Sequence, residues 1–323
     1  IQELHDVVAS GGIEKFYSAL PYKYSHFHAP EVKFVWTVHG LREIECPTDR
    51  YERRFLRTRN DFKKYVTKVL APDRHQRVKK NIIRTLLSVD CAELSIVVPS
   101  CHTKYSLYLE VSDLPQVSVQ ALSSPVREQL EIGELPEKAQ LHDRFGLASR
   151  GFFLVTSAGR WIKNAYRATN ALDDLISRGL FRDRTVVVCG IARDQRDLFK
   201  VKNKSYFKFL DYVSDQDLSV LYAHAYALVY PSLNEGYGYP PVEAMKYGTP
   251  VLAAANTAIP EVCGDAALYF EARDEREFSV RVLTLIEEKG LWDIMSKKAT
   301  DRYCHLYERQ QKDLDELCDL ILS

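Results

Sequence analysis

The chain has 323 residues, of which 46% are hydrophobic and 27% charged, the composition of an ordinary globular protein rather than a disordered or fibrous one. Its 44 basic and 44 acidic residues cancel, so no global charge argument points to a partner. No apolar run approaches the roughly 20 residues that a membrane-spanning helix needs, and no signal peptide opens the chain, so we expect a cytoplasmic protein.

The length suits two domains better than one. We expect residues 1–123 to form the first domain, 124–145 a connection with a short helix, 146–303 the second domain and 304–323 a C-terminal helix. Seven cysteines, an odd number without a Cys-x-x-Cys pair, predict neither a disulfide framework nor a zinc cage.

The first half alternates strand-like apolar runs, at residues 32–38, 94–99 and 117–122, with helical stretches, which is typical of a parallel α/β sheet. His39 and Ser100 each follow one of these strands and should emerge at the carboxyl edge of the sheet, where ligands bind in open α/β folds. A structural histidine is the alternative for His39, and Ser100 is expected to cap the next helix rather than to bind phosphate.

Residues 50–84 carry a local excess of positive charge, with thirteen Lys or Arg residues against three acidic ones and interleaved aromatic residues. This pattern is typical of a basic amphipathic helix that rests on anionic lipid or faces an acidic acceptor. A solvated helical face is the alternative, and we do not expect nucleic acid as a partner.

The second half predicts a doubly wound α/β domain. Strands are expected at residues 152–157, 185–189, 207–209, 227–230, 250–254 and 268–270, and helices at 165–177, 215–225, 241–247, 274–288, 291–303 and 308–322. Two cations, Arg160 and Lys163, follow the first of these strands and could neutralise a diphosphate without a metal.

Residues 231–245, Pro-Ser-Leu-Asn-Glu-Gly-Tyr-Gly-Tyr-Pro-Pro-Val-Glu-Ala-Met, place two carboxylates around a glycine loop that opens a helix. The first N–H groups of such a helix bind an anion, and glycines let a ligand approach the backbone closely. We expect Glu235 in the loop and Glu243 in the first helical turn, each facing hydroxyls of a nucleotide sugar. The alternative is that Glu243 complements the helix N-terminus and Glu235 is a solvated loop residue.

Asp215 and Asp217 formally match the Asp-x-Asp motif of metal-dependent glycosyltransferases. Ser214, with Asp217 three residues on, is instead typical of a helix N-cap with acidic residues in the first turn. The sequence therefore predicts no metal site and no cofactor beyond the donor substrate.

The segment from Glu235 to Glu243, Glu-Gly-Tyr-Gly-Tyr-Pro-Pro-Val-Glu, resembles the EX7E donor-site motif of retaining glycosyltransferase family 4, whose members have the GT-B fold. Further blocks in the family's order lie at residues 159–164, 212–218, 221–225, 247–252 and 259–270, so the resemblance covers most of residues 145–323. It implies two Rossmann-like doubly wound domains facing a cleft. Residues 28–39 resemble middle strands, which implies a truncated or reduced N-terminal domain, and the C-terminal helix is expected to pack back toward that domain.

The resemblance also implies roles for individual residues. Glu243 would hold the ribose hydroxyls and Glu235 the donor-sugar hydroxyls, while His39 would meet the sugar from the other domain. Lys163 and Arg160 would take the diphosphate, with Lys163 the firmer of the two assignments. The remaining donor-binding positions are Gly236, Tyr237, Gly238 and Tyr239 around the diphosphate and the backbone of Tyr212 and Val213 at the base.

The resulting prediction is a retaining, metal-independent hexosyltransferase that moves a sugar from a nucleoside-diphosphate sugar to a glycan or lipid-linked acceptor, in surface polysaccharide or lipid-linked glycan synthesis. It would act in the cytoplasm, peripherally on the inner face of the membrane through residues 50–84. A nucleotide-sugar epimerase or hydrolase, and a non-catalytic nucleotide-sugar-binding module, are the alternatives.

Overall fold

The computed structural model describes residues 12–21, 28–112, 117–123, 125–126 and 138–322, and the chain divides into two compact units. The first unit consists of residues 1–48, 63–125 and 308–323, and the second of residues 49–62 and 126–307. Residues 49–62 thus belong with the second unit, although they were predicted to lie in the first domain. Among the described residues, no helix is both long and apolar enough to cross a membrane.

The first unit is built on a parallel sheet of four described strands, β1 (Lys15–Ser18), β2 (His28–Thr37), β3 (Asp90–Val98) and β4 (Val117–Ala121), whose spatial order follows the chain. Because each strand is added on the same side of the one before it and crossover connections are right-handed, the connecting helices lie on one face of the sheet. These helices, α4 (Pro72–Leu87) and α5 (Cys101–Val111), join the core cluster that contains Phe34, Trp36 and Leu94. A smaller helix, α2 (Arg42–Glu45), follows β2.

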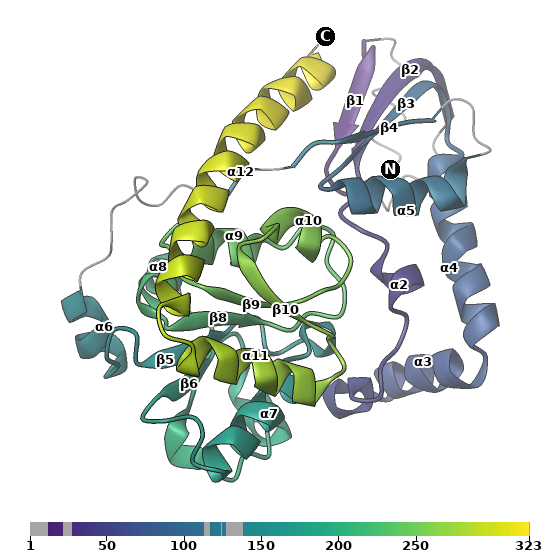
Figure 1. Cartoon of the computed structure of the whole chain (residues 1–323). Helices are drawn as coiled ribbons and strands as arrows, with labels where there is room; N and C mark the ends of the chain where they lie inside the picture. Colours follow the sequence, from purple (N-terminus) through teal and green to yellow (C-terminus); the bar gives the residue numbers. More distant parts are fainter. Residues whose placement is uncertain (1–11, 22–27, 113–116, 124, 127–137, 323) are drawn as a thin grey trace. The chain divides into compact units, whose positions relative to one another are not determined.

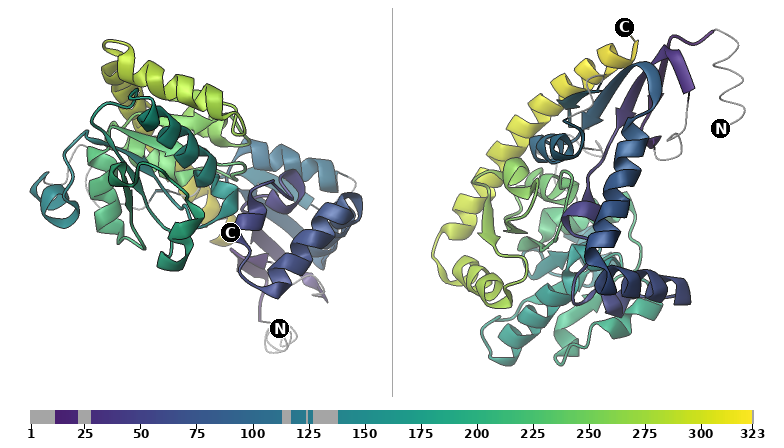
Figure 2. Two further views of the ribbon diagram at one scale, coloured as in Figure 1. Left: turned by 90° about the horizontal axis from the view of Figure 1, so that it is seen from below. Right: turned by 90° about the vertical axis from the view of Figure 1, so that its right-hand side faces the viewer.

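The opposite face of this sheet is covered by the end of the C-terminal helix α12 (Leu291–Leu322). Val35, Val97 and Leu122 pack there against three residues of α12, namely Leu317, Leu320 and Ile321. Alternate residues of a strand point to opposite faces of a sheet. Strands β2 and β3 therefore contribute to the core around Phe34 and Leu94 and also to the core around Val35 and Val97. Figures 1 and 2 show the end of α12 beside this sheet.

The second unit contains a six-stranded parallel sheet in the order β10-β9-β8-β5-β6-β7. Its strands are β5 (Phe152–Val155), β6 (Thr185–Val188), β7 (Phe207–Phe209), β8 (Ala227–Tyr230), β9 (Val251–Ala254) and β10 (Ala267–Phe270). The chain runs outward from β5 to β7 and returns to β8, which pairs with β5 on its other side. This reversal makes the sheet doubly wound, as predicted, and puts its topological switch point between the carboxyl ends of β5 and β8.

Helices cover both faces of this sheet (Figure 1). The described helices of the unit are α6 (Lys138–Phe145), α7 (Ala165–Ser177), α8 (Asp215–His224), α9 (Tyr239–Met245), α10 (Ile259–Cys263), α11 (Glu275–Glu287) and the first part of α12. Short 3-10 turns lie at Glu52–Phe55, Trp161–Lys163, Arg193–Leu198 and Lys204–Tyr206. Strands β5, β8 and β9 are fully buried because both faces of the sheet are covered, which explains their unbroken apolar runs.

One expectation about helices was wrong, and one strand was not predicted. Residues 291–303 and 308–322 form one continuous helix of 32 residues, because nothing in the intervening Cys-His-Leu-Tyr breaks a helix. The short strand β1 was missed. The basic segment is also divided: α3 (Arg59–Leu70) begins in the part that belongs to the second unit and ends in the first.

Candidate functional site at the switch point of the second sheet

The loop after β8 turns into α9 through a glycine. Gly238, the residue before the helix, has φ +114°, a left-handed conformation that favours glycine, whereas Gly236 does not have a positive φ. Pro240 and Pro241 lie in the first turn of α9, where a missing N–H costs nothing. The helix begins at Tyr239, so Glu243 lies beyond the first turn and the expected first-turn position was wrong.

Lys163 and Glu235 form an ion pair at the switch point. Lys163 Nζ lies 2.5 Å from Glu235 Oε1, and the two side chains are 8% and 14% exposed. Lys163 Nζ also donates to the hydroxyl of Tyr230 at 3.3 Å and lies 5.3 Å from the centre of that ring. The structure therefore brings together two residues that the sequence analysis selected separately, and it joins them directly.

The Glu235 carboxylate is held on its own loop as well. Ser232 Oγ donates to Glu235 Oε1 at 2.5 Å, and the backbone N–H of Glu235 donates to Thr257 Oγ1 at 3.0 Å. Thr257 has φ +48°, so the loop after β9 adopts a strained conformation where it meets Glu235. Carboxylate oxygens accept several hydrogen bonds each, so Glu235 retains capacity for ligand hydroxyls.

Lys163 is positioned by the residue that follows it. Asn164 has φ +58° and donates through Nδ2 to the carbonyl oxygens of Pro231 at 2.9 Å and Ala272 at 2.6 Å. A further backbone hydrogen bond of 2.8 Å joins Leu233 N–H to the Ile162 carbonyl. These contacts fasten the loop after β5 to the loop after β8, and so fasten Lys163 to Glu235.

Tyr230 and Tyr222 are buried tyrosines next to the two proposed ligand carboxylates. Burial raises the pKa of Tyr230 well above its ordinary value, and the nearby Glu235 carboxylate raises it further. Burial likewise raises the pKa of Tyr222, with the Glu243 carboxylate as the second cause. Both phenols are therefore neutral at physiological pH and can act as hydrogen-bond donors toward Glu235 and Glu243.

Arg160 differs from Lys163, although both follow β5. Arg160 is exposed and precedes the short turn Trp161–Lys163, whereas Lys163 is buried in it. Its carbonyl accepts from the N–H of Lys163 at 3.0 Å. Of the two cations, Lys163 is the one that the structure fixes beside Glu235.

The Asp215–Asp217 segment is a helix start. Ser214 Oγ accepts from Asp217 N–H at 3.1 Å and donates to its carboxylate at 2.8 Å, and Asp217 also pairs with Arg144. The predicted N-cap is confirmed. Within the described parts of the chain, no group of three His, Cys, Asp or Glu side chains is arranged to hold a metal ion.

The predicted base-contacting residues precede this helix. Tyr212 and Val213 lie between β7 and α8, and the Tyr212 side chain is 87% exposed. Tyr237 is buried, and its ring centre lies 4.8 Å from that of Tyr239. Tyr212, Val213 and Tyr237 therefore lie in the loops that follow β7 and β8, and Tyr239 begins α9. The base-binding role of Tyr212 and Val213 remains a prediction.

His39 and Ser100 lie in the first unit. His39 Nε2 is 3.0 Å from the carbonyl oxygen of Ala19, and the residue is exposed just beyond β2. Ser100 Oγ accepts from Thr103 N–H at 3.1 Å at the start of α5, which confirms the predicted cap. The proposed role of His39 toward a donor sugar remains a prediction.

Sequence reasoning missed Asn164, Ser232, Thr257 and Tyr230 as partners of the site. Asn164 carried a readable signal, because asparagine tolerates the left-handed region and follows Lys163 directly. Ser232 is three residues before Glu235, but the two residues lie in an irregular loop without helical or strand periodicity. Their hydrogen bond could therefore not be inferred from the sequence.

Open α/β sheets bind their ligands in the crevice at the switch point, and in this sheet Lys163 and Glu235 lie there. Residues 140–302, half of the chain, match the family described as glycosyl transferases group 1. The chain belongs to this family. The matched segment includes the whole six-stranded sheet, Lys163, Glu235 and Glu243.

Three curated relatives show similarity over shorter stretches. A 95-residue stretch is 38% identical to O-antigen chain mannosyltransferase B of Escherichia coli, covering 29% of this chain and 25% of that protein. The O-antigen chain mannosyltransferase RfbU of Salmonella typhimurium is 39% identical over 97 residues, 29% of this chain and 28% of that protein. MMP alpha-(1->4)-mannosyltransferase of Mycolicibacterium hassiacum is 48% identical over 52 residues, 16% of this chain and 13% of that protein. The chain therefore matches between 13% and 28% of these relatives' lengths.

Solved structures with similar folds cover nearly the whole chain. Sucrose-phosphate synthase from Thermosynechococcus elongatus aligns with a TM-score of 0.69 at 14% identity, over 99% of this chain and 75% of that one. WaaG, a glycosyltransferase involved in lipopolysaccharide biosynthesis, aligns with a TM-score of 0.63 at 14% identity, over 100% of this chain and 95% of that one. The predicted α/β architecture with two parallel sheets, that of GT-B glycosyltransferases, is confirmed. Assignment to family 4 and its EX7E motif stays a prediction.

Proposed function

We propose that the chain is a retaining hexosyltransferase that takes its sugar from a nucleoside-diphosphate sugar and transfers it to an acceptor hydroxyl in polysaccharide or lipid-linked glycan synthesis. The observation that carries the proposal is the Lys163–Glu235 ion pair beside the glycine turn into α9. The names of the relatives, mannosyltransferases of O-antigen chains among them, favour a mannosyl donor and a glycan acceptor.

In this proposal, Glu235 binds hydroxyls of the donor sugar and Glu243 binds the ribose hydroxyls. The Lys163 ammonium donates to Glu235 and to Tyr230. In the donor complex it would also contact an oxygen of the diphosphate, together with N–H groups between Gly236 and Tyr239. A cation fixed before the substrate arrives stabilises the charge that develops on the leaving diphosphate.

Transfer breaks the bond between the anomeric carbon and the diphosphate oxygen. The acceptor oxygen bonds to the same face of that carbon, and the acceptor hydroxyl proton passes to the departing diphosphate. No step in this scheme uses a metal, because Lys163 and backbone N–H groups neutralise the leaving group. Catalysis then rests on placing the two substrates and on stabilising the leaving group, effects that are commonly large.

We also propose that an anionic membrane surface is a partner of the first unit. The parts of helices α3 and α4 that belong to the first unit expose four large apolar side chains, Val69, Leu70, Val78 and Ile82. Four cations of the same parts, Lys63, Lys64, Arg74 and Arg77, are exposed as well. Apolar residues among exposed cations are what a helix needs to rest on anionic lipid.

Three cations of the basic segment interact with other parts of the protein. Arg54 lies over the ring of Tyr166 at 4.5 Å, Lys80 pairs with Glu110 at 2.7 Å and Lys79 with Glu43 at 3.3 Å. These cations are already engaged within the protein, so they contribute less to a surface charge than the sequence count implied.

Donor use is tested by thermal unfolding with GDP-, UDP-, ADP- and dTDP-sugars, followed by product analysis with and without a lipid-linked acceptor. Stabilisation by one donor and acceptor-dependent transfer, with the anomeric configuration retained by NMR, are expected. Conversion of the donor without an acceptor would instead indicate an epimerase or hydrolase. Tight binding without turnover on any acceptor would indicate a binding module.

A further inference from the structure

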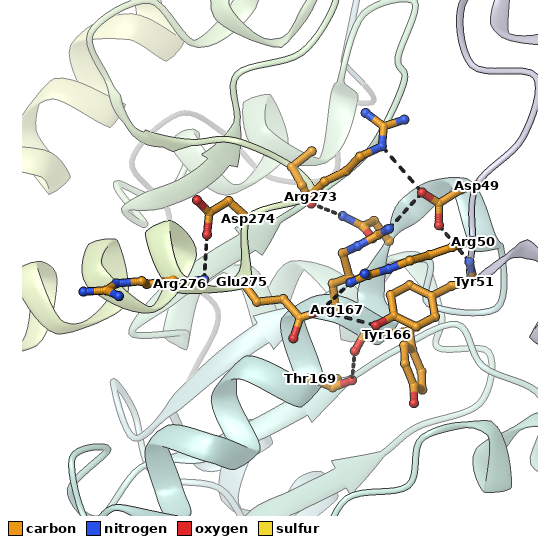
Figure 3. Close-up of polar contacts among 12 residues, drawn as sticks. Asp49, Arg50, Tyr51, Tyr166, Arg167, Thr169, Arg273, Asp274, Glu275 and Arg276 are labelled. Atoms are coloured by element: carbon orange, nitrogen blue, oxygen red, sulfur yellow. Dashed lines mark hydrogen bonds and ion pairs between the residues drawn. The ribbon is translucent and has the colours of Figure 1, made fainter.

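Arg167 is a buried arginine on α7 that the proposed chemistry does not use. Its side chain is 4% exposed and donates through Nη2 to Asp49 Oδ2 at 2.9 Å and through Nη1 to Asn164 Oδ1 at 2.7 Å. Its guanidinium lies 4.6 Å from the centre of the Tyr51 ring. Figure 3 shows Arg167 and Arg273 converging on Asp49 from separate elements.

Asp49 belongs to a segment that is fastened to the second unit at several points. Asp49 Oδ1 accepts from the N–H of Tyr51 at 2.9 Å, and Arg273 Nε lies 3.6 Å from Oδ2. The Tyr51 ring centre is 4.7 Å from that of Tyr166, and its hydroxyl donates to Glu275 at 3.4 Å. The Tyr51 N–H and the Arg273 guanidinium therefore hold the Asp49 carboxylate in addition to Arg167.

Arg167 fixes the orientation of the Asn164 side-chain amide. An arginine can only donate, so the atom of Asn164 that faces it must be the oxygen. The amide nitrogen is then directed at the carbonyl oxygens of Pro231 and Ala272, where both of its hydrogens find acceptors. Reversing the amide would place two donors together and leave two buried carbonyl groups without this partner.

We propose that Asp49 and Arg167 are positioning residues for the Lys163–Glu235 pair, acting through Asn164. The proposal rests on the function proposed above. Asn164 directly follows Lys163, and Pro231 opens the loop that carries Glu235, so one amide fixes the spacing between the two charged groups. Small misplacements of reacting groups lower rates strongly, so loss of the amide's orientation reduces turnover more than it reduces donor binding.

The decisive variant is Arg167→Met, which keeps an apolar stem and removes both hydrogen bonds. Its matched control is Asp173→Asn on the same helix. Asp173 is a buried carboxylate that accepts from the N–H groups of Lys202 at 2.7 Å and Asn203 at 3.0 Å, without contacting Asn164. Both variants lose buried hydrogen bonds of α7, but only Arg167→Met removes the hydrogen bond that orients the Asn164 side-chain amide.

Steady-state transfer is measured well below the melting temperatures of all variants. Arg167→Met is expected to lower kcat at least tenfold, on the order of the effect of a misplaced catalytic group, with the donor KM within about twofold. Asp173→Asn should lower the melting temperature and leave kcat within about twofold. Asp49→Asn combined with Arg167→Met should be no slower than Arg167→Met alone, because both act through one amide. Unchanged kcat in Arg167→Met, or an equal loss in Asp173→Asn, would overturn the proposal.

A second measurement does not depend on transfer. The full chain and its variants are treated briefly with acetic anhydride, and acetylation of Lys163 is quantified by mass spectrometry relative to exposed Lys200. Lys163 is 8% exposed and paired in the parent, so it should react slowly. Its labelling should rise several-fold in Arg167→Met and stay unchanged in Asp173→Asn. If Lys163 labelling rises in Arg167→Met but the parent transfers no sugar, the glycosyltransferase proposal is refuted and the positioning role is not. If Lys163 labelling is unchanged in Arg167→Met, the positioning role is refuted.

Discussion

Lys163 Nζ lies 2.5 Å from Glu235 Oε1, and this ion pair joins the loops that end two neighbouring strands, β5 and β8. Both side chains are almost buried, so their attraction is weakly screened by solvent. In the donor complex proposed above, the diphosphate would therefore share Lys163 with Glu235.

Glu235→Ala is expected to lower turnover by on the order of a hundredfold while nucleoside-diphosphate affinity is retained or improves. The substitution removes the proposed acceptor for sugar hydroxyls and the carboxylate that would compete with phosphate oxygens for Lys163. Steady-state transfer and calorimetric titration with the nucleoside diphosphate measure the two effects. Equal losses in turnover and in diphosphate affinity would show that Glu235 does not serve the transferred sugar.

Glu243→Ala is expected to weaken nucleoside-diphosphate binding about tenfold or more, since a hydrogen bond to a charged group contributes roughly 1.5–3 kcal/mol. Glu243 is half-buried on α9, so its truncation should leave the fold intact. Titration calorimetry gives the dissociation constant, and circular dichroism checks the fold. An unaltered dissociation constant would remove Glu243 from the donor site.

Transfer is expected to persist in excess EDTA, because Lys163 and the N–H groups before α9 are proposed to hold the diphosphate. Initial rates with EDTA, and after adding manganese, test this. Rates that vanish with EDTA and return with manganese would make Asp215 and Asp217 candidate ligands again.

The full chain is expected to attach to anionic vesicles in a salt-dependent manner through α3 and α4, each cation contributing about 1 kcal/mol at most. The test variant carries Glu at Lys63, Lys64, Arg74 and Arg77. Its matched control carries Glu at four exposed lysines of the second unit, Lys200, Lys204, Lys289 and Lys297, for the same change in charge. Co-sedimentation of the control, but not of the test variant, with anionic vesicles supports the proposed membrane surface. Equal binding of the two variants, or no binding by the parent, rejects it.

Asp49→Asn is expected to lower the free energy of unfolding at neutral pH by about 3 kcal/mol, because it leaves the buried Arg167 without its counter-ion. Burial by itself raises the pKa of Asp49, but hydrogen bonds from Arg167 and Tyr51 and the charges of Arg167 and Arg273 outweigh it, so the pKa is lowered. A lowered pKa in the folded state gives stability that is present above the ordinary aspartate pKa and lost as the pH falls below it.

The difference between parent and Asp49→Asn should therefore be constant near neutral pH and shrink below about pH 4. Urea unfolding at several pH values measures it. A difference that is absent at neutral pH, or that grows on acidification, would contradict the assigned ion pair.

Local signals in the sequence predicted much of the second unit. The strands at residues 207–209 and 227–230 were predicted with their observed bounds because each is a short apolar run between helix and turn signals. The Ser100 and Ser214 caps followed from a serine placed just before a helix. The motif around the glycine turn was visible because all of its residues are close together in the chain.

Contacts between distant residues could not be predicted in this way. Lys163 and Glu235 are 72 residues apart, and Asp49 and Arg167 are 118 apart. Charge and spacing indicated that Lys163 and Glu235 each bind ligand, but only the strand order places them together. Nothing in the local pattern distinguishes Arg167 from a solvated arginine on an amphipathic helix, so its burial follows from the docking of residues 49–55.

The sheet of the first unit has a consequence for synthesis of the chain on the ribosome. Val35, Val97 and Leu122 emerge early, whereas Leu317, Leu320 and Ile321, which cover them, are made 195 or more residues later. The Ser123 hydroxyl donates a hydrogen bond of 2.6 Å to the carboxylate of Asp313, which is also made late. Until then one apolar face of the nascent sheet is uncovered, the situation in which nascent chains aggregate or engage chaperones. The second unit, apart from residues 49–62, is made as one continuous stretch, so it can complete its fold before the unit that precedes it.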